Sequence, residues 1–180
     1  MGETSRDEDK PGSPPACDRG EQVAGHAAPS RSESSQAVPS GREARNGRPT
    51  VLVSACLLGV TCRHDGTSRE RPELLARLNG SRLVPVCPEQ LGGLPTPRIP
   101  CRIEGGTGTD VLAGRARVVD EKGLDRTENF LRGAEESVKL ARKFGATKAL
   151  LKSRSPSCDA QGGVAAAALR TQGLDVEGVD

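Results

Sequence analysis

The sequence predicts an α/β protein: one compact domain in which a mostly parallel sheet is flanked by helices, in a Rossmann-like three-layer arrangement. Short apolar runs alternate along the chain with longer segments whose apolar residues recur at helical spacing. Successive strands separated by a helix become parallel neighbours, because the helix returns the chain to the edge at which the first strand began. This alternation is typical of a sheet that is covered by helices.

Five apolar runs are predicted to be strands. Four of them occupy residues 51–55, 83–86, 116–119 and 149–151, and a weaker candidate occupies residues 174–176. Valine and leucine dominate these runs, as expected of strands that are buried on both faces. The order of the runs along the chain therefore supports a mostly parallel sheet.

Three intervening segments, at residues 71–78, 128–144 and 163–171, are predicted to be helices. The middle segment has the clearest pattern, with Thr127 as its N-cap and Gly145 closing it. Steps of three and four residues place its apolar side chains on one face, which we expect to pack on the sheet. That face comprises Phe130, Ala134, Val138, Ala141 and Phe144.

Residues 1–49 are predicted to form a disordered N-terminal tail, and residues 50–180 a single domain of about 130 residues. The tail contains no Leu, Ile or Phe and is rich in Ser, Pro, Gly, Arg and Glu. Such a segment buries too little apolar surface to offset the entropy that it loses on ordering. Cys17 lies in this tail and is expected to take no part in a site.

The composition argues against two kinds of partner. No window approaches the length of apolar chain that crosses a bilayer, so no membrane partner is expected. The net charge is only +2, and the chain has two Phe but no Tyr or Trp on which bases could stack. We therefore do not expect a nucleic-acid binder.

Six cysteines occur without the apolar stretch of a secretory signal, and the acidic residues near the start are untypical of a transit peptide. A cytoplasmic protein is therefore expected. In that compartment, groups of cysteines more often serve metal or redox chemistry than disulfides. The alternative for each cysteine is a buried small apolar residue.

Three cysteines lie where predicted strands end. Cys56 follows the first strand, Cys87 follows residues 83–86, and Cys158 lies in the loop after residues 149–151. In a parallel sheet all three leave the carboxyl edge, where open α/β sheets bind their ligands. Core cysteines would instead be scattered along the strands, so the sequence predicts one joint site.

The spacing of these cysteines restricts the metal chemistry. No C-x-x-C pair occurs, so neither a structural zinc site nor a ferredoxin-type cluster is expected. Three thiolates from separate loops suit a site that keeps one coordination position open for substrate. A cubane iron–sulfur cluster held by three cysteines has one such iron, which can act as a Lewis acid.

Polar residues beside these cysteines are candidates for proton transfer. Glu89 lies two residues after Cys87, and Ser155 belongs to a Lys/Arg/Ser run just before Cys158. A carboxylate and a hydroxyl next to an open metal position can relay protons. The alternatives are an exposed loop charge or a helix cap for Glu89, and a solvated or anion-binding loop for the basic run.

Three other features allow more than one interpretation. Cys62 is either a fourth thiol near the site or a loop residue. The segment RHDG that follows it predicts a tight turn at Asp65-Gly66 rather than a metal pair with His64. Gly162-Gly163 before the last helix could contact an anion through backbone amides, although two glycines alone are a weak signal.

Five segments in order resemble the thiouracil desulfidase family: VLVSACLLG, CRHDG, VCPEQLGGLPTPR, GTGTDVLAG and LKSRSPSC, within about residues 51–176. The resemblance implies a compact α/β fold with a 4Fe–4S cluster as cofactor. By position, the cluster ligands would be Cys56, Cys87 and Cys158, and Glu89 and Ser155 would be the acid/base and substrate-orienting groups. The implied reaction is the non-redox desulfuration of a small thiolated base or nucleoside, such as 2-thiouracil, to the oxo base and sulfide.

A non-catalytic sensor or scaffold that kept the fold and bound a cluster or metal is the alternative function. The segment between Cys158 and the last predicted helix is shorter than family members usually have, which favours this alternative. The presence of all three cysteines together with Glu89 and Ser155 favours the enzyme.

Overall fold

The structure is a computed structural model that describes residues 47–180. The predicted tail at residues 1–49 lies almost entirely outside the described residues, so it stays a prediction, as does the domain boundary at residue 50. No helix among the described residues is long and apolar enough to cross a bilayer.

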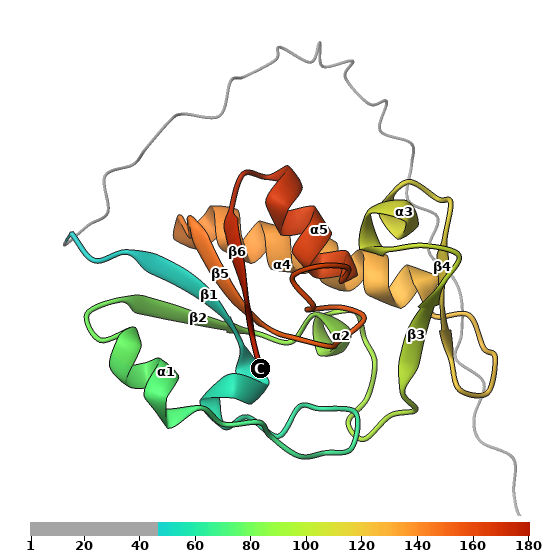
Figure 1. The fold of residues 1–180 in the computed structure, drawn as a ribbon, viewed down its shortest axis with the longest axis horizontal. Helices are drawn as coiled ribbons and strands as arrows, with labels where there is room; N and C mark the ends of the chain where they lie inside the picture. Colours follow the sequence, from blue (N-terminus) through green and yellow to red (C-terminus); the bar gives the residue numbers. More distant parts are fainter. Residues whose placement is uncertain (1–46) are drawn as a thin grey trace, which may run out of the picture. The chain divides into compact units, whose positions relative to one another are not determined.

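Four parallel strands form the central sheet, in the spatial order β2–β1–β5–β6 (Figure 1). They are β1 (Thr50–Ser54), β2 (Arg82–Val86), β5 (Lys148–Lys152) and β6 (Asp175–Val179). Pro85 is tolerated in β2 because that strand lies at the edge of the sheet. The predicted α/β class with a mostly parallel sheet is confirmed.

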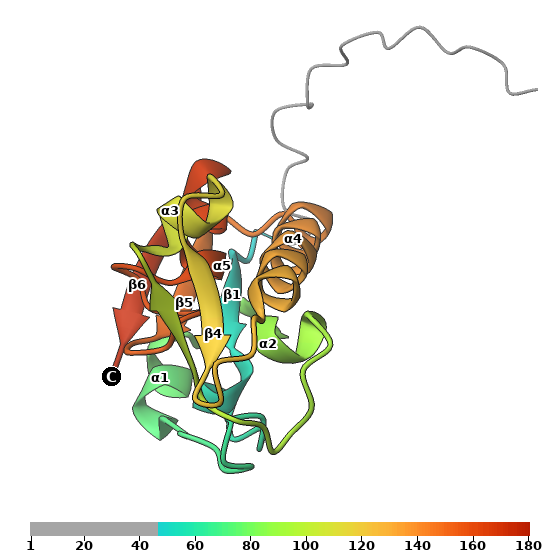
Figure 2. The ribbon, with the colours of Figure 1, turned by 90° about the vertical axis from the view of Figure 1, so that its right-hand side faces the viewer.

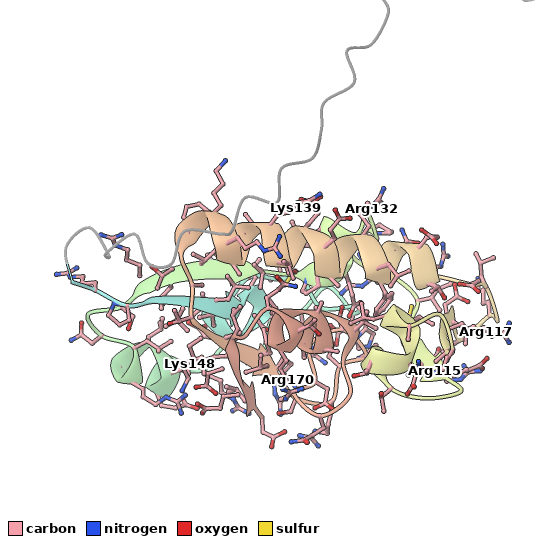
Figure 3. All side chains as sticks on the ribbon, turned by 90° about the horizontal axis from the view of Figure 1, so that it is seen from above. Arg115, Arg117, Arg132, Lys139, Lys148 and Arg170 are labelled. Atoms are coloured by element: carbon pink, nitrogen blue, oxygen red, sulfur yellow. The ribbon has the colours of Figure 1, made fainter. Side chains whose placement is uncertain are left out.

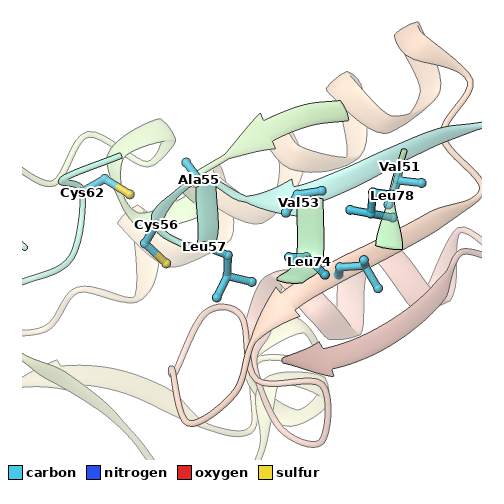
Figure 4. Packing of buried hydrophobic residues seen from close by; sticks show 9 residues of the cluster. Val51, Val53, Ala55, Cys56, Leu57, Cys62, Leu74 and Leu78 are labelled. Carbon is cyan, nitrogen blue, oxygen red and sulfur yellow. The ribbon is translucent and has the colours of Figure 1, made fainter. Parts of the chain in front are cut away.

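One face of the sheet is covered by α1 (Pro72–Arg77). Val51 and Val53 of β1 are buried on this face, where they belong to one apolar cluster with Leu74 and Leu78 (Figure 4). Side chains two residues apart in a strand point to the same face, so the residue between them faces the opposite way.

The opposite face is covered by α4 (Thr127–Phe144) and α5 (Val164–Thr171). Leu52 of β1 is fully buried there, in a cluster with Ala141 of α4 and Leu169 of α5. Helices therefore lie on both faces of the sheet, and the predicted three layers are present.

Residues 116–119 do form a strand, but it lies outside the parallel sheet. This strand, β4 (Arg117–Asp120), pairs antiparallel with β3 (Cys101–Glu104), and α3 (Gly108–Leu112) connects the two (Figure 2). The sequence pattern did not predict β3, because its four residues CRIE contain two charges and no apolar run. The pair packs through Val118 on a third apolar cluster that includes Phe130 of α4.

Two details predicted for α4 were wrong. The residue at its N-cap is Arg126 rather than Thr127, because the Thr127 hydroxyl accepts a hydrogen bond from the Val118 amide at 2.9 Å instead of capping the helix. Phe144 is 52% exposed and leaves the buried face. The closing role of Gly145 is confirmed, since its φ of 65° is left-handed.

The outer side of α4 is polar. Arg132 and Lys139 project from this side of the helix (Figure 3), and Lys139 pairs with Glu135 and Glu136. Such pairs one helical turn apart support an exposed helix surface. Only the inner side of α4 therefore contributes to the core.

The order of the strands creates a crevice at the carboxyl end of β1. From β1 the chain passes through α1 to β2 on one side, whereas from β5 it passes through α5 to β6 on the other side. A sheet whose connections diverge in this way opens at the divergence, and ligands of open α/β sheets bind there.

Candidate functional site

A cavity of about 250 Å³ lies at this carboxyl edge. It is lined by the last residues of β1, β2 and β5 and by residues that follow them, together with Arg98, Pro100 and Cys101 at the start of β3. The cysteines in its walls are Cys56, Cys62, Cys87, Cys101 and Cys158. All five are free thiols.

Local structure places each of the three predicted ligands at the cavity. Cys56 lies in the 3-10 turn η1 (Ala55–Leu58), which breaks the chain out of β1 and ends at Gly59 with φ 90°. Cys87 is the N-cap of α2 (Pro88–Leu91), where Pro88 starts a new helix immediately after β2. Figure 4 shows Cys56 and Cys62 beyond the end of β1.

Cys158 is held by a serine turn. The Ser155 hydroxyl accepts hydrogen bonds from the amides of Ser157 at 3.3 Å and Cys158 at 3.2 Å. Just before it, Arg154 has a left-handed backbone with φ 58°, and its amide donates to the Asp159 carboxylate at 3.2 Å. A non-glycine residue in this conformation is strained, and such strain is typical of functional loops.

Cys62 lies between two of the predicted ligands. It shares hydrogen bonds with the thiols of Cys56 and Cys87, and the Cys87 thiol also donates to the Cys62 carbonyl at 3.6 Å. Cys62 is 2% exposed. Of the two interpretations offered by the sequence, the fourth thiol at the site is the one that this position supports.

The thiols differ in how readily they ionise. The hydrogen bond from Cys62 lowers the pKa of Cys56, and the same bond raises the pKa of Cys62. The pKa of Cys87 is raised by its bond with Cys62 and by burial. Burial raises the pKa of Cys158 to about 12 and that of Cys101 to about 11. Metal must therefore displace protons from most of these thiols.

Glu89 lies in the first turn of α2, beside Cys87, and its side chain is only 13% exposed. Arg98 Nε donates to Glu89 Oε2 at 2.6 Å. The sequence allowed two alternatives for this carboxylate, an exposed loop charge or a helix cap, and it is neither. It is a largely buried ion-paired group in the wall of the cavity.

Apart from the cysteines and the ion pair of Glu89 with Arg98, the ionisable side chains of the cavity wall are basic. They are Arg63, His64, Lys152 and Arg154. Burial lowers the pKa of Lys152, and the neighbouring Arg154 adds to that effect. Since Glu89 is the only carboxylate in the lining and is paired with Arg98, the charges of the cavity wall favour a bound anion.

The donor set fits an iron–sulfur cluster better than a single metal ion. Within residues 47–180, no three His, Cys, Asp or Glu side chains are gathered so that they could hold one ion. Thiolates on a cluster bind different iron atoms, so they surround a volume instead of converging on a point. Five thiols in the walls of one cavity offer donors for such a group.

Two minor predictions have clear outcomes. The turn at Asp65-Gly66 is confirmed, since the Asp65 carboxylate accepts the Thr67 amide at 3.0 Å and Gly66 has φ 76°. The suggested anion contact at Gly162-Gly163 is contradicted at Gly163, whose amide donates to the Asp159 carbonyl, and the next two amides donate to the carbonyls of Pro156 and Ser157. Cys17 lies outside the described residues.

Sequence reasoning missed Arg98 as a member of this site. Its only signal was its place at the end of the segment CPEQLGGLPTPR, nine residues after Glu89. It also left Cys101 without a role, because the strand that carries Cys101 was not predicted.

The comparisons with known proteins cover the part of the chain that forms this site. A family model described as 2-thiouracil desulfurase matches residues 51–178. YbbK, an uncharacterized protein of Bacillus subtilis (strain 168), is 42% identical over 108 residues, which are 60% of this chain and 72% of that protein. The solved structure of TudS, a 4Fe–4S-dependent thiouracil desulfidase, is similar with a TM-score of 0.63 at 37% identity, over 73% of this chain and 91% of that chain. The chain therefore belongs to the 2-thiouracil desulfurase family.

Proposed function

We propose that this domain removes sulfur from a small thiolated pyrimidine such as 2-thiouracil and releases the oxo base and sulfide. One observation carries the proposal: the cavity of a member of this family is walled by five free thiols and a single, largely buried carboxylate. The structural similarity to a 4Fe–4S-dependent thiouracil desulfidase supports the same cofactor here.

The residues that would hold a 4Fe–4S cluster are Cys56, Cys87 and Cys158, which come from three different strand ends. A cluster with three protein ligands supplies one iron as a Lewis acid for a sulfur atom of the substrate. The basic residues of the wall compensate the negative charge that thiolates and sulfide bring into the cavity.

Glu89 is proposed as the acid/base. Replacing C=S by C=O with water moves two protons from the water to the departing sulfur and requires no oxidant or reductant. A carboxylate at the reacting carbon can take a proton from the attacking water and return it to the sulfur. Glu89 Oε2 is held by Arg98, whereas Oε1 accepts no hydrogen bond from the described residues and is left for this task.

Ser155 is proposed to orient the substrate. Its oxygen already accepts two backbone amides of the Cys158 turn, and its hydroxyl, which also contacts the Cys158 thiol, would donate its proton to a ring nitrogen or oxygen of the base. The same two hydrogen bonds fix the turn that carries Cys158. We therefore expect Ser155 to serve both the substrate and the position of a cluster ligand.

We further propose that residues 50–180 are the catalytic domain, that residues 1–49 form a tail outside it, and that the protein works in the cytoplasm. A reducing compartment keeps thiols free for a cluster. Neither a membrane nor a nucleic acid is needed for the proposed reaction, whose partner is a free base or nucleoside.

The proposal is tested with Glu89→Gln, which keeps the shape of the side chain and removes its proton transfer. Anaerobic sulfide release from 2-thiouracil should fall by about 10²–10⁴-fold, the range typical of a general acid/base, while iron content stays at the parent value. Glu104→Gln is the matched control, because Glu104 is also paired with arginine, at 3.0 Å to Arg117, but lies outside the cavity.

If Glu89→Gln released sulfide as fast as the parent, Glu89 would not be the acid/base. A parent protein that binds the cluster but desulfurates no thiopyrimidine would instead favour the non-catalytic sensor or scaffold. The short connection from Cys158 to the start of α5 at Val164 is the feature that favours this second function.

A further inference from the structure

We infer that Arg98 is a positioning residue for this reaction: its guanidinium fixes the Glu89 carboxylate and the Cys62 loop against the cavity. The inference rests on the proposed function, because it assigns to Arg98 an effect on catalysis that acts through Glu89.

The guanidinium of Arg98 links three segments that are separate in the chain. Nε donates to Glu89 Oε2 at 2.6 Å, and Nη2 donates to the Cys62 carbonyl at 3.0 Å. Nη1 donates to the Pro95 carbonyl at 3.2 Å and to the Thr96 hydroxyl at 3.1 Å. Every nitrogen of the planar group therefore has a partner, and its orientation is fixed.

The backbone of Arg98 is fixed as well. Its amide donates to the His64 carbonyl at 2.8 Å, so the chain after the Thr96-Pro97 turn is attached to the loop that carries Cys62 and His64. The Arg98 side chain is only 6% exposed. A side chain that is held at both ends in this way can transmit its position to Glu89.

The geometry of this contact points to catalysis rather than to stability alone. A buried ion pair contributes little net stability compared with apolar side chains in its place, because the loss of hydration offsets the attraction, although removing one partner alone destabilises the fold. Arg98 binds one carboxylate oxygen and leaves Oε1 of Glu89 free beside the cavity. That arrangement selects one rotamer of the carboxylate, with the unpaired oxygen available for proton transfer.

Lysine can reproduce only part of this role. A lysine ammonium is a single point charge on a flexible chain, whereas the arginine fork presents donors in a fixed plane. Lysine at position 98 would retain the charge near Glu89 but lose the simultaneous hold on the Cys62 carbonyl and on the Pro95-Thr96 turn.

The test compares Arg98→Gln, Arg98→Lys and Glu89→Gln with the double variant Arg98→Gln/Glu89→Gln, each loaded anaerobically with iron and sulfide. We expect Arg98→Gln to lower kcat for 2-thiouracil by about 10²-fold, the usual effect of a misplacement near 1 Å, with KM and iron per chain close to the parent values. Arg98→Lys should recover part of the loss. The double variant should be no slower than Glu89→Gln alone, since removing the clamp has no effect once the clamped carboxylate is absent.

Chemical rescue adds a second readout. Guanidinium ion at tens of millimolar should restore part of the activity of Arg98→Ala, whereas ammonium at the same ionic strength should not. The matched control is Arg126→Gln, which breaks the pair between Arg126 and the buried Asp120 at 3.1 Å, outside the cavity. It should lower the melting temperature and leave kcat unchanged.

Three outcomes would overturn the inference. Arg98→Gln could keep the parent kcat, its effect could multiply fully with that of Glu89→Gln, or its activity per bound cluster could stay constant while cluster content and melting temperature fall. Each would show that Arg98 acts independently of Glu89 or only on the fold. A parent enzyme without any sulfide release would overturn the proposed function as well, so the two failures are distinguishable.

Discussion

Gly133→Ala should damage catalysis from a position on α4 that is not in the cavity wall. A Cβ at Gly133 would lie 2.0 Å from the Pro88 carbonyl oxygen and 2.8 Å from its carbon. Pro88 is the first residue of α2 and directly precedes Glu89. The two helices approach so closely because glycines face each other: a Cβ at Gly92, the C-cap of α2, would likewise lie 2.0 Å from the Asn129 carbonyl oxygen of α4.

The size of the effect follows from these contacts. Relieving the overlap requires α2 to move by about 1 Å, and overpacking of this kind costs about 1–3 kcal/mol. The gain in helix propensity from Gly to Ala returns about 1 kcal/mol, so the net loss in the free energy of unfolding is about 0–2 kcal/mol. A shift of about 1 Å at a catalytic group can slow the reaction by about 10²-fold. Catalysis should therefore suffer more than stability.

Urea denaturation and sulfide release from 2-thiouracil, measured on the same cluster-loaded preparation, separate the two effects. Gly162→Ala is the matched control, because its Cβ would meet only Asp159 at 4.0 Å, and it should keep the parent activity. A Gly133→Ala variant as active as the parent would refute the close α2–α4 contact as the support of Glu89.

Three further predictions concern the cysteines, a helix cap and the tail. After anaerobic reconstitution, the brown chromophore should be lost with Cys56→Ser, Cys87→Ser and Cys158→Ser, because two remaining ligands hold a cubane poorly. It should be kept with Cys17→Ser, Cys62→Ser and Cys101→Ser. A hydrogen bond from the Thr107 amide, and to a smaller extent one from Arg115, lowers the pKa of Asp110 from 3.8 to about 2. This carboxylate therefore stabilises the fold above about pH 4, and the contribution is lost as the pH falls toward 2. Asp110→Asn should thus flatten the acid side of the melting-temperature profile, and an unchanged profile would contradict the assignment. Deleting residues 1–46 should leave melting temperature and iron content unchanged, and a large loss of either would show that the tail packs on the domain.

The parallel sheet could be predicted because its strands contain short runs of apolar residues, which is the pattern of strands that are buried on both faces. The strand β3 could not, since its four residues carry Arg102 and Glu104, which pair with each other on an exposed surface. The helices α2 and α3 have four and five residues, fewer than two turns, so no helical period can appear in them. Short elements of this kind are specified by tertiary packing rather than by pattern.

The site was predictable to the extent that strand ends determine it. Cys56, Cys87 and Cys158 could be brought together from the sequence because parallel strands end at one edge. Arg98 reaches Glu89 through a loop whose path no local rule gives, and the position of Cys62 beside two other thiols depends on the same loop. Arg98 follows Glu89 by nine residues and Cys62 follows Cys56 by six. Most of each interval is loop, in which a sequence pattern carries no information about distances.

The central claim is that this cavity holds a four-iron cluster, and elemental analysis after anaerobic reconstitution tests it most directly. We expect about four iron and four sulfide per chain, with broad brown absorbance that fades in air, the composition that a cubane requires. One zinc per chain with no iron taken up would contradict the claim.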